Sequence, residues 1–270
     1  MKISLLIVLS LLFTGHFSFA WKYTIPPFSQ SLVKFGASLF SKPLLKNEFS
    51  LVVWNVHKGK DGEAWVNDMK ILTDNSDVLL VQEAMDDELM IEMYENRIKN
   101  YDWFFAKSFT YLQTGNSSGV ANASPYQITR SILHRTNDLE PIVGTPKTVI
   151  LSYMTMESGQ PIAFLNIHGL NRTTNAAFYR QIDETLNLIK NFSGPVVYAG
   201  DFNTNNKSKF NGLDERMLKY GLKRYNYTED NRKHKLDWIY VRGCEIEKSE
   251  ILYQFQTSDH KPLFARLNCN

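Results

Sequence analysis

The chain has 270 residues, of which 43% are hydrophobic and 21% charged, and its 30 basic and 28 acidic residues leave a net charge of +2. This is the composition of an ordinary globular protein with one large domain or two small ones, and it excludes a disordered or fibrous chain. The balanced charge and the lack of a polybasic run give no support to a chromatin-type or heparin-type binding protein.

The first twenty residues have the features of a secretory signal. Lys2 precedes an apolar run from Ile3 to Phe13, and the small residues Ser18 and Ala20 fit the site at which a signal peptidase cuts. We therefore expect residues 1–20 to be a signal peptide and the mature protein to be periplasmic or secreted. The alternative, an uncleaved anchor, is disfavoured because the apolar run is short for a membrane span.

Further along the chain, residues 21–47 are predicted to form an irregular lead-in, because prolines at positions 26, 27 and 43 interrupt any regular element. Over residues 48–270, apolar strand patterns alternate with helical patterns, which indicates one domain. Strands are expected at 49–55, 77–83, 102–106, 148–156, 161–168, 196–201, 235–243, around 250–254 and at 262–267, short strands and loops at 111–146, and helices at 64–72, 86–98 and 177–191.

Two kinds of connection define the predicted architecture. Residues 157–160 separate two apolar strands with a hairpin-like turn. The helix at 177–191 carries Phe178, Ile182 and Leu186 on one stripe and leads into the next strand. Hairpins mixed with strand–helix–strand units favour an α/β fold in which two mixed β-sheets pack face to face with helices outside.

The two cysteines, Cys244 and Cys269, leave two possibilities open. In an oxidising compartment an even pair favours a disulfide, whereas two unpaired thiols are the alternative, because sequence does not show whether the Cα atoms lie close enough to join. Neither cysteine has a partner at a spacing typical of zinc sites.

Several apolar strands end on, or begin with, a residue of a type found in catalytic sites. Each alone has an ordinary explanation, since Asn and Asp often start turns and a single His is commonly structural. Their recurrence indicates function, because loops at the ends of rigid strands are where scaffolds carry their sites. The residues are Asn55, Glu83, His168, Asp201, Asn203, Asp237, Asp259 and His260.

The side chains in this set suit metal-assisted hydrolysis. Mg²⁺ binds through one or two carboxylates and keeps its other positions for water and substrate phosphate, and Glu83 with Asn55 can supply those ligands. Hydrolysis of a phosphate ester also needs a base for water, a role that a His held by a carboxylate fills near neutral pH. His260 with Asp237 would be that pair.

Two further residues can supply donors for the charge that develops on the phosphate, Asn203 through its amide and His168 through its ring. The His–carboxylate pair is also found in serine hydrolases, but the sequence has no Gly-x-Ser-x-Gly motif to carry a nucleophile. Direct attack by activated water is therefore favoured.

Taken together, these residues resemble the endonuclease/exonuclease/phosphatase superfamily, which has the deoxyribonuclease I-like fold. The resemblance runs from about Phe49 to Leu267, and it implies a four-layer α/β/β/α sandwich with Mg²⁺ at one end of the sheets. The motifs, in the order expected for the superfamily, are Trp54-Asn55, Gln82-Glu83, Asn166-Ile167-His168, Gly200-Asp201-Phe202-Asn203, Leu236-Asp237-Trp238-Ile239 and Ser258-Asp259-His260.

The resemblance implies a metal site. Glu83 is similar to the metal-binding Glu of the superfamily, and Asn55 would assist it. Asp259 is similar to a further carboxylate that binds the metal or supports the neighbouring His. The implied ion is Mg²⁺, with Mn²⁺ or Ca²⁺ as alternatives.

The resemblance also implies catalytic roles. Asp201 and Asn203 are similar to the pair that orients the attacking water and the transition-state oxygens. His260 resembles the catalytic His, held by Asp237, and His168 resembles the second active-site His of the deoxyribonuclease and sphingomyelinase branches.

Within the superfamily, segments such as SSGVANAS and TPKTVILSYM are most similar to a branch of exported or membrane-associated bacterial proteins. The predicted activity is hydrolysis of a phosphodiester, with nucleic acid as the first substrate and an exported endonuclease as the first reading. The alternatives are a lipid or inositol phosphodiesterase or phosphatase, and a binding module without catalysis. Arg130 and Arg172 are candidates for gripping phosphate, and a monomer without a stable protein partner is expected.

Overall fold

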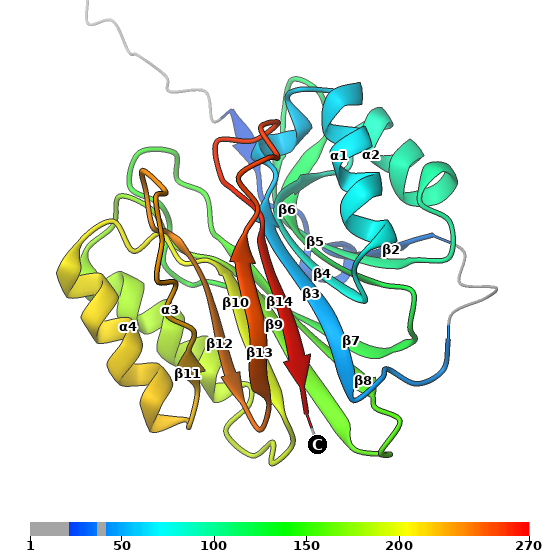
Figure 1. The fold of residues 1–270 in the computed structure, drawn as a ribbon. Helices are drawn as coiled ribbons and strands as arrows, with labels where there is room; N and C mark the ends of the chain where they lie inside the picture. The colour runs from blue at the N-terminus through cyan, green and yellow to red at the C-terminus, as the bar shows by residue number, and fades with distance from the viewer. Residues whose placement is uncertain (1–21, 37–41, 270) are drawn as a thin grey trace, which may run out of the picture.

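The computed structural model describes residues 22–36 and 42–269. The predicted signal peptide, residues 1–20, lies outside the described residues. Two β-sheets pack face to face, with helices on their outer sides (Figure 1). The first sheet contains, in spatial order, β1 (Tyr23–Thr24), β5 (Asp102–Tyr111), β6 (Ser117–Ser124), β4 (Val78–Met85), β3 (Glu48–Asn55), β14 (Leu263–Asn268) and β13 (Glu245–Ile251), and β2 (Leu32–Phe35) also pairs with β5. The second contains β11 (Lys223–Arg224), β12 (Asp237–Arg242), β10 (Val196–Asp201), β9 (Pro161–His168), β8 (Thr148–Thr155) and β7 (Ile128–Arg135).

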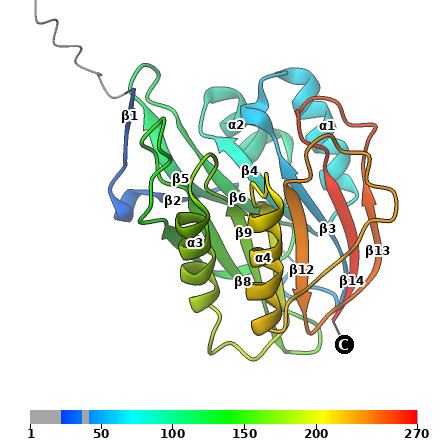
Figure 2. The same ribbon diagram turned by 90° about the vertical axis from the view of Figure 1, so that its left-hand side faces the viewer.

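The helices form the two outer layers. On the first sheet lie α1 (Glu63–Asp74) and the short α2 (Glu88–Glu92), which continues into a π-helical turn at Met93–Arg97. Figure 2 shows α3 (Asn175–Asn187) and α4 (Lys207–Lys219) side by side over the second sheet. In the part of the chain that the structure describes, no helix has the length and apolar character needed to cross a membrane.

Alternation along the strands produces three apolar layers. In β4, Val78 and Leu80 face the space between the sheets, while Leu79 and Val81 face the helices of the first sheet. A third cluster fills the space between the second sheet and α3 and α4. Each fully buried aliphatic side chain contributes about 1.5–3 kcal/mol. Both faces of the central strands are covered, which confirms the predicted four-layer sandwich and explains why these strands appear as unbroken apolar runs.

The structure corrects the sequence-based elements in three places. Residues 21–47 are not all irregular, because β1 and β2 pair with β5 and extend the first sheet. Helix α4 was not predicted, although Asn206 caps it and Leu213 and Met217 are buried at helical spacing. The strand expected around 250–254 lies earlier, at β13, where its exposed edge position gives it little apolar pattern.

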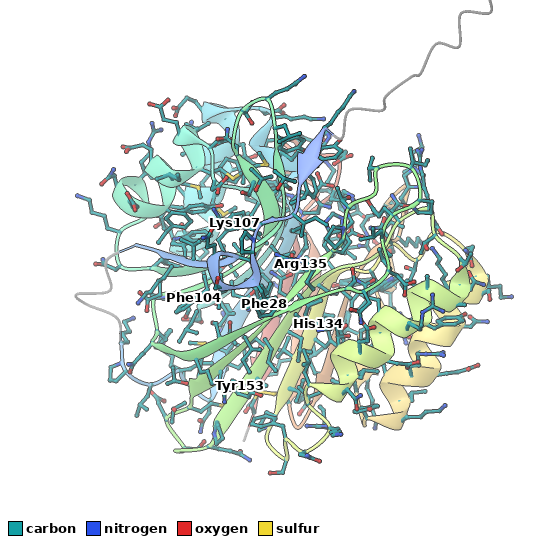
Figure 3. All side chains as sticks on the ribbon, turned by 180° about the vertical axis from the view of Figure 1, so that it is seen from behind. Phe28, Phe104, Lys107, His134, Arg135 and Tyr153 are labelled. Carbon is teal, nitrogen blue, oxygen red and sulfur yellow. A yellow bond between two sulfur atoms is a disulfide. The ribbon has the colours of Figure 1, made fainter. Side chains whose placement is uncertain are left out.

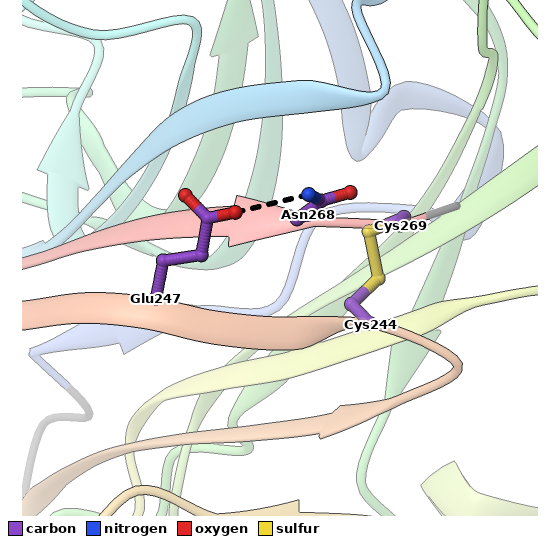
Figure 4. Close-up of a disulfide and its surroundings, with 4 residues drawn as sticks. All are labelled: Cys244, Glu247, Asn268 and Cys269. Atoms are coloured by element: carbon purple, nitrogen blue, oxygen red, sulfur yellow. Dashed lines mark hydrogen bonds between the residues drawn. A yellow bond between two sulfur atoms is a disulfide. The ribbon is translucent and has the colours of Figure 1, made fainter.

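Cys244 and Cys269 form a disulfide (Figure 4). Cys244 lies in the connection between β12 of the second sheet and β13 of the first, and Cys269 directly follows β14. Cys269 is 1% exposed and packs in the layer between the sheets. Beside it, Asn268 donates a hydrogen bond to Glu247 at 2.9 Å. The bond therefore fastens the crossing from one sheet to the other.

Candidate active site

The second sheet gathers three of the predicted side chains at one end of its strands. β9 and β10 run parallel and pair His168 with Asp201, while the antiparallel neighbour β12 pairs Asp237 with the same Asp201. Gly200 permits the close approach, because its φ is +139° and a Cβ there would lie 2.1 Å from the carbonyl oxygen of Ile167. The strand register thus places an imidazole and two carboxylates on adjacent strands.

The first sheet brings the other predicted group to the same end. β3 and β4 run parallel and pair Asn55 with Gln82. A β-bulge follows Gln82, where Glu83 adopts a φ of +52° and faces a cleft. β14 pairs with β3 from Leu263 onward, so the loop that carries His260 lies at the end of β3.

Both groups meet in this cleft, which has a volume of about 1000 Å³. Asn55 is 1% exposed and lies behind the cleft wall, where its amide donates to Asp201 Oδ2 at 3.0 Å. The predicted residues that line the cleft are Glu83, His168, Arg172, Asp201, Asn203, Asp237, Asp259 and His260.

His260 and Asp237 form a close ion pair. His260 Nδ1 lies 2.9 Å from Asp237 Oδ2, and His260 Nε2 lies 3.9 Å from Asp201 Oδ2. Burial lowers the pKa of His260, but Asp237, Asp201 and Asp259 outweigh it and raise that pKa to about 10. The ring therefore carries a proton at neutral pH. Arg232 is buried behind the pair and donates to the backbone carbonyl of Asp237 at 3.0 Å, which fixes the start of β12.

Asp201 is one of two fully buried carboxylates of the site, at 2% exposure, the same as Asp237. Burial and the neighbouring Asp237 raise its pKa to about 6, although the hydrogen bonds that it accepts act in the opposite direction. The backbone N–H of Asn203 donates to Asp201 Oδ1 at 2.9 Å, and the Asn203 amide donates to the carbonyl of Gly169 at 2.9 Å. Asn203 therefore fixes the turn that presents Asp201.

The oxygen donors beside the cleft fit a hard divalent cation. No donor among the described residues lies within hydrogen-bond distance of the Glu83 carboxylate, and the ammonium of Lys58 is 3.7 Å away. Asn55 Oδ1 accepts the N–H of His57 at 3.1 Å and keeps a second lone pair. Asp259, whose side chain is 62% exposed, lies 3.6 Å from His57 Nδ1. Carboxylate and amide oxygens are what Mg²⁺ and similar ions prefer. Among the described residues, the closely spaced group of acidic and histidine side chains that could hold an ion is Asp201, Asp237 and His260.

His168 lies between charges of both signs. Its Nε2 is 3.3 Å from Lys147 Nζ, 3.6 Å from Asp201 Oδ2 and 4.0 Å from Glu83 Oε1. Burial, and after it the positive charge of Lys147, holds the pKa of His168 well below its ordinary range. The two histidines of the site therefore differ in charge at neutral pH.

A buried amide pair joins the two sheets directly beneath the cleft. Gln82 Nε2 donates to Asn166 Oδ1 at 2.6 Å. Asn166 Nδ2 in turn donates to the carbonyls of Val81 and Ala121, each at 3.0 Å. Because these bonds link β9 to β4 and β6, they fix the distance between the halves of the site.

The two arginines predicted to bind substrate lie in different places. Arg172 is exposed and lines the cleft. The structure does not bring Arg130 there. Arg130 is exposed on β7 opposite Tyr153, while the end of this hairpin nearest the site is where Arg135 pairs with Thr148. Figure 3 shows Tyr153 well below Arg135. Five strand residues place Arg130 about 16 Å from that end, a consequence of strand direction that the sequence did not reveal.

Sequence reasoning missed several cations that line the cleft, among them Lys58, Lys147 and Arg232. The available signal was position, since Lys147 directly precedes a predicted strand and Lys58 follows one closely. Lysine is common at strand ends on protein surfaces, so this signal alone did not distinguish them.

Comparison with known proteins points to one family. The profile of the endonuclease/exonuclease/phosphatase family matches residues 52–260, most of the chain. A UPF0294 protein of Vibrio cholerae is 27% identical over 264 residues, covering 91% of each chain. The catalytic domain of human Nocturnin with a bound sulfate anion superposes with a TM-score of 0.64 at 15% identity, over 91% of this chain and 100% of that one. A mannosyl-6-phosphatase of Bacteroides thetaiotaomicron gives 0.61 at 13% identity, over 81% and 99%. These likenesses confirm the predicted fold class.

Proposed function

Because the chain belongs to the endonuclease/exonuclease/phosphatase family, we propose that it is an exported, divalent-metal-dependent hydrolase of phosphodiester bonds. Members of this family are hydrolases that act on phosphoester bonds. The observation that carries the proposal is the convergence, in one cleft, of side chains from separate motifs on both sheets. Glu83 comes from the first sheet, His168, Asp201 and Asp237 come from the second, and His260 comes from the loop before β14.

The arrangement supports a division of work among these side chains. A divalent ion held by Glu83 and Asn55, when bound, would neutralise charge on the substrate phosphate. Asp201, beside His168 and His260, is placed to orient an attacking water. His260 carries a proton and is held by Asp237, so its ring can donate a hydrogen bond to the phosphate or a proton to the leaving group. The proposed role of His260 as a donor differs from the general base expected from sequence, because three neighbouring carboxylates keep the ring protonated.

The substrate proposed first is nucleic acid, and the activity proposed first is that of an endonuclease. The exposed side chains of Arg172 and Lys233 line the cleft and can contact successive phosphates of a strand. A second candidate is a lipid or inositol phosphoester, and one observation favours it. Ile142 and Val143, which are 72% and 36% exposed, also line the cleft and offer an apolar surface beside it.

A substrate panel tests the proposal. Plasmid DNA, RNA, sphingomyelin, phosphoinositides and bis(p-nitrophenyl) phosphate are each incubated with Mg²⁺, with Mn²⁺ or with EDTA. We expect hydrolysis of at least one diester, its loss in EDTA, and a fall in rate on the order of 10³-fold in Glu83→Gln, since the metal contributes several kcal/mol.

The matched control is Glu250→Gln, which removes a carboxylate paired with Lys248 on the exposed edge strand β13. It should retain the wild-type rate. Folded protein that cleaves none of these substrates, or that works equally well in EDTA, would refute the proposal.

Export is the second part of the proposal. The apolar run at residues 3–13 and the small residues before Trp21 support a cleaved signal, and the disulfide between Cys244 and Cys269 is of a kind that persists in oxidising compartments. Mass spectrometry of the expressed protein should find it outside the cytoplasm with its N-terminus at Trp21. Full-length chain held in the membrane fraction would favour the uncleaved anchor instead.

A further inference from the structure

One buried cation on the cleft wall has no role in the scheme above. Lys147 is 8% exposed and lines the cleft between the strand ends. Its Nζ lies 3.3 Å from Glu140 Oε1 and 3.3 Å from His168 Nε2. Burying a lysine is costly unless its charge is compensated, and here one carboxylate and one imidazole contact the ammonium on the cleft wall.

The loop before Lys147 fixes the position of its side chain. Thr136 donates its backbone N–H to the carbonyl of Lys147 at 3.0 Å, and Lys147 donates its own N–H to Thr136 Oγ1 at 3.0 Å. The backbone N–H of Glu140 donates across the loop to the carbonyl of Thr145, and its side-chain Oε1 accepts the N–H of Asn171 at 2.9 Å. The ammonium is therefore positioned by Glu140 of this loop and by His168 at the end of β9 before any ligand enters.

The direction of the hydrogen bond with His168 follows from the chemistry of lysine. An ammonium group has three donors and no acceptor, so His168 Nε2 must be the acceptor in this contact. That nitrogen then has no hydrogen to donate toward the cleft. His168 uses one of the three Lys147 donors, Glu140 balances the charge from 3.3 Å, and donor hydrogens of the ammonium are left for a ligand.

We propose that Lys147 supplies the cationic hydrogen bond to a non-bridging oxygen of the substrate phosphate, and that His168 and Glu140 act as positioning residues for it. The inference rests on the proposed phosphodiesterase activity and deepens it. It reassigns the donor role expected of His168 to a residue that no sequence motif identified. A charge-assisted contact of this kind in a partly enclosed site typically accounts for about 10²–10³-fold in rate.

The test uses the full mature protein, Mg²⁺ and bis(p-nitrophenyl) phosphate. Lys147→Met should lower kcat/KM by about 10²–10³-fold, and Lys147→Arg should recover part of the loss. The control is Lys209→Met, which removes another buried lysine, 1% exposed, whose Nζ lies over the ring of Phe178 in the outer layer. If Met at 147 prevents folding, Lys147→Gln tests the same point. Activity of Lys147→Met within about threefold of the control overturns the inference.

A double-mutant cycle separates positioning from independent catalysis. If His168 acts through Lys147, the double variant Lys147→Met with His168→Ala should be no slower than Lys147→Met alone. If the two losses multiply, His168 contacts the phosphate by itself and the assignment fails.

The affinity for inorganic phosphate, measured by calorimetry in the presence of Mg²⁺, provides a readout that does not need turnover. Phosphate affinity should fall about 10- to 100-fold in Lys147→Met, the value of one hydrogen bond to a charged group, and should not change in Lys209→Met. Wild-type protein that binds phosphate through Lys147 but cleaves no substrate would refute the proposed function, and of this inference only the phosphate contact of Lys147 would remain. Equal phosphate affinity in both variants would refute the inference alone.

Discussion

Removal of the disulfide between Cys244 and Cys269 should destabilise the protein while leaving its chemistry intact. The bond closes a loop with a sequence separation of 25 residues, which contains β13, the segment with His260, and β14. The cysteines lie at the end of the sheets away from the cleft, because Cys269 follows β14 and His260 precedes it. The double variant Cys244→Ala with Cys269→Ala should therefore fold less stably but work normally when folded.

The length of the loop that the disulfide closes sets the size of the expected loss in stability. Closing a loop of this length removes conformational entropy from the unfolded chain equivalent to about 3.5 kcal/mol at 25 °C. Loss of the bond should lower the free energy of unfolding by that amount, which is a large part of the 5–15 kcal/mol typical of a domain.

Urea unfolding followed by tryptophan fluorescence measures the difference, with wild type in oxidising and reducing buffer beside the double variant. The free energy of unfolding of the variant should equal that of reduced wild type and should not change when reductant is added. The variant should keep the wild-type kcat in the absence of urea. A loss below about 1 kcal/mol would show that the loop is already restricted in the unfolded state. A folded variant with reduced kcat would refute the separation of the bond from the site.

Two further predictions concern the site itself. Asp237→Asn should lower the pKa of His260 from about 10, because the ring loses its principal carboxylate partner; NMR titration of the ring measures the change. Since the folded pKa is raised, the stabilisation that His260 provides is complete below its ordinary value near 6.5 and is lost as pH rises toward 10. The free energy of unfolding of wild type should fall more steeply over that window than that of the variant, and parallel curves would contradict the pairing. Gly200→Ala should cost about 2 kcal/mol or more and most of the activity, because its Cβ would meet the Ile167 carbonyl at 2.1 Å. Gly115→Ala, also at positive φ but with open space around it, is the control, and equal stability losses in the two variants would rule out the clash.

The sequence determined the parts of the protein whose physics is local. The strand segments Phe49–Asn55 and Val196–Asp201 are buried on both faces, so nearly every residue in them is apolar. Such unbroken apolar runs are recognisable in the sequence. The polar residues that end those runs were also readable, and parallel pairing in both sheets then brings His168 beside Asp201 and Asn55 beside Gln82. Most of the predicted site residues line one cleft for this reason.

Tertiary structure decided the features that depend on partners distant in sequence. The bulge that turns Glu83 toward the cleft arises from its pairing with β6, and strand direction alone keeps Arg130 away. Lys147 has the sequence context of an ordinary surface lysine and becomes part of the site only because Glu140 and His168 close around it. Local pattern reports which faces a segment buries, but the register, direction and neighbours that set these positions are fixed by long-range contacts.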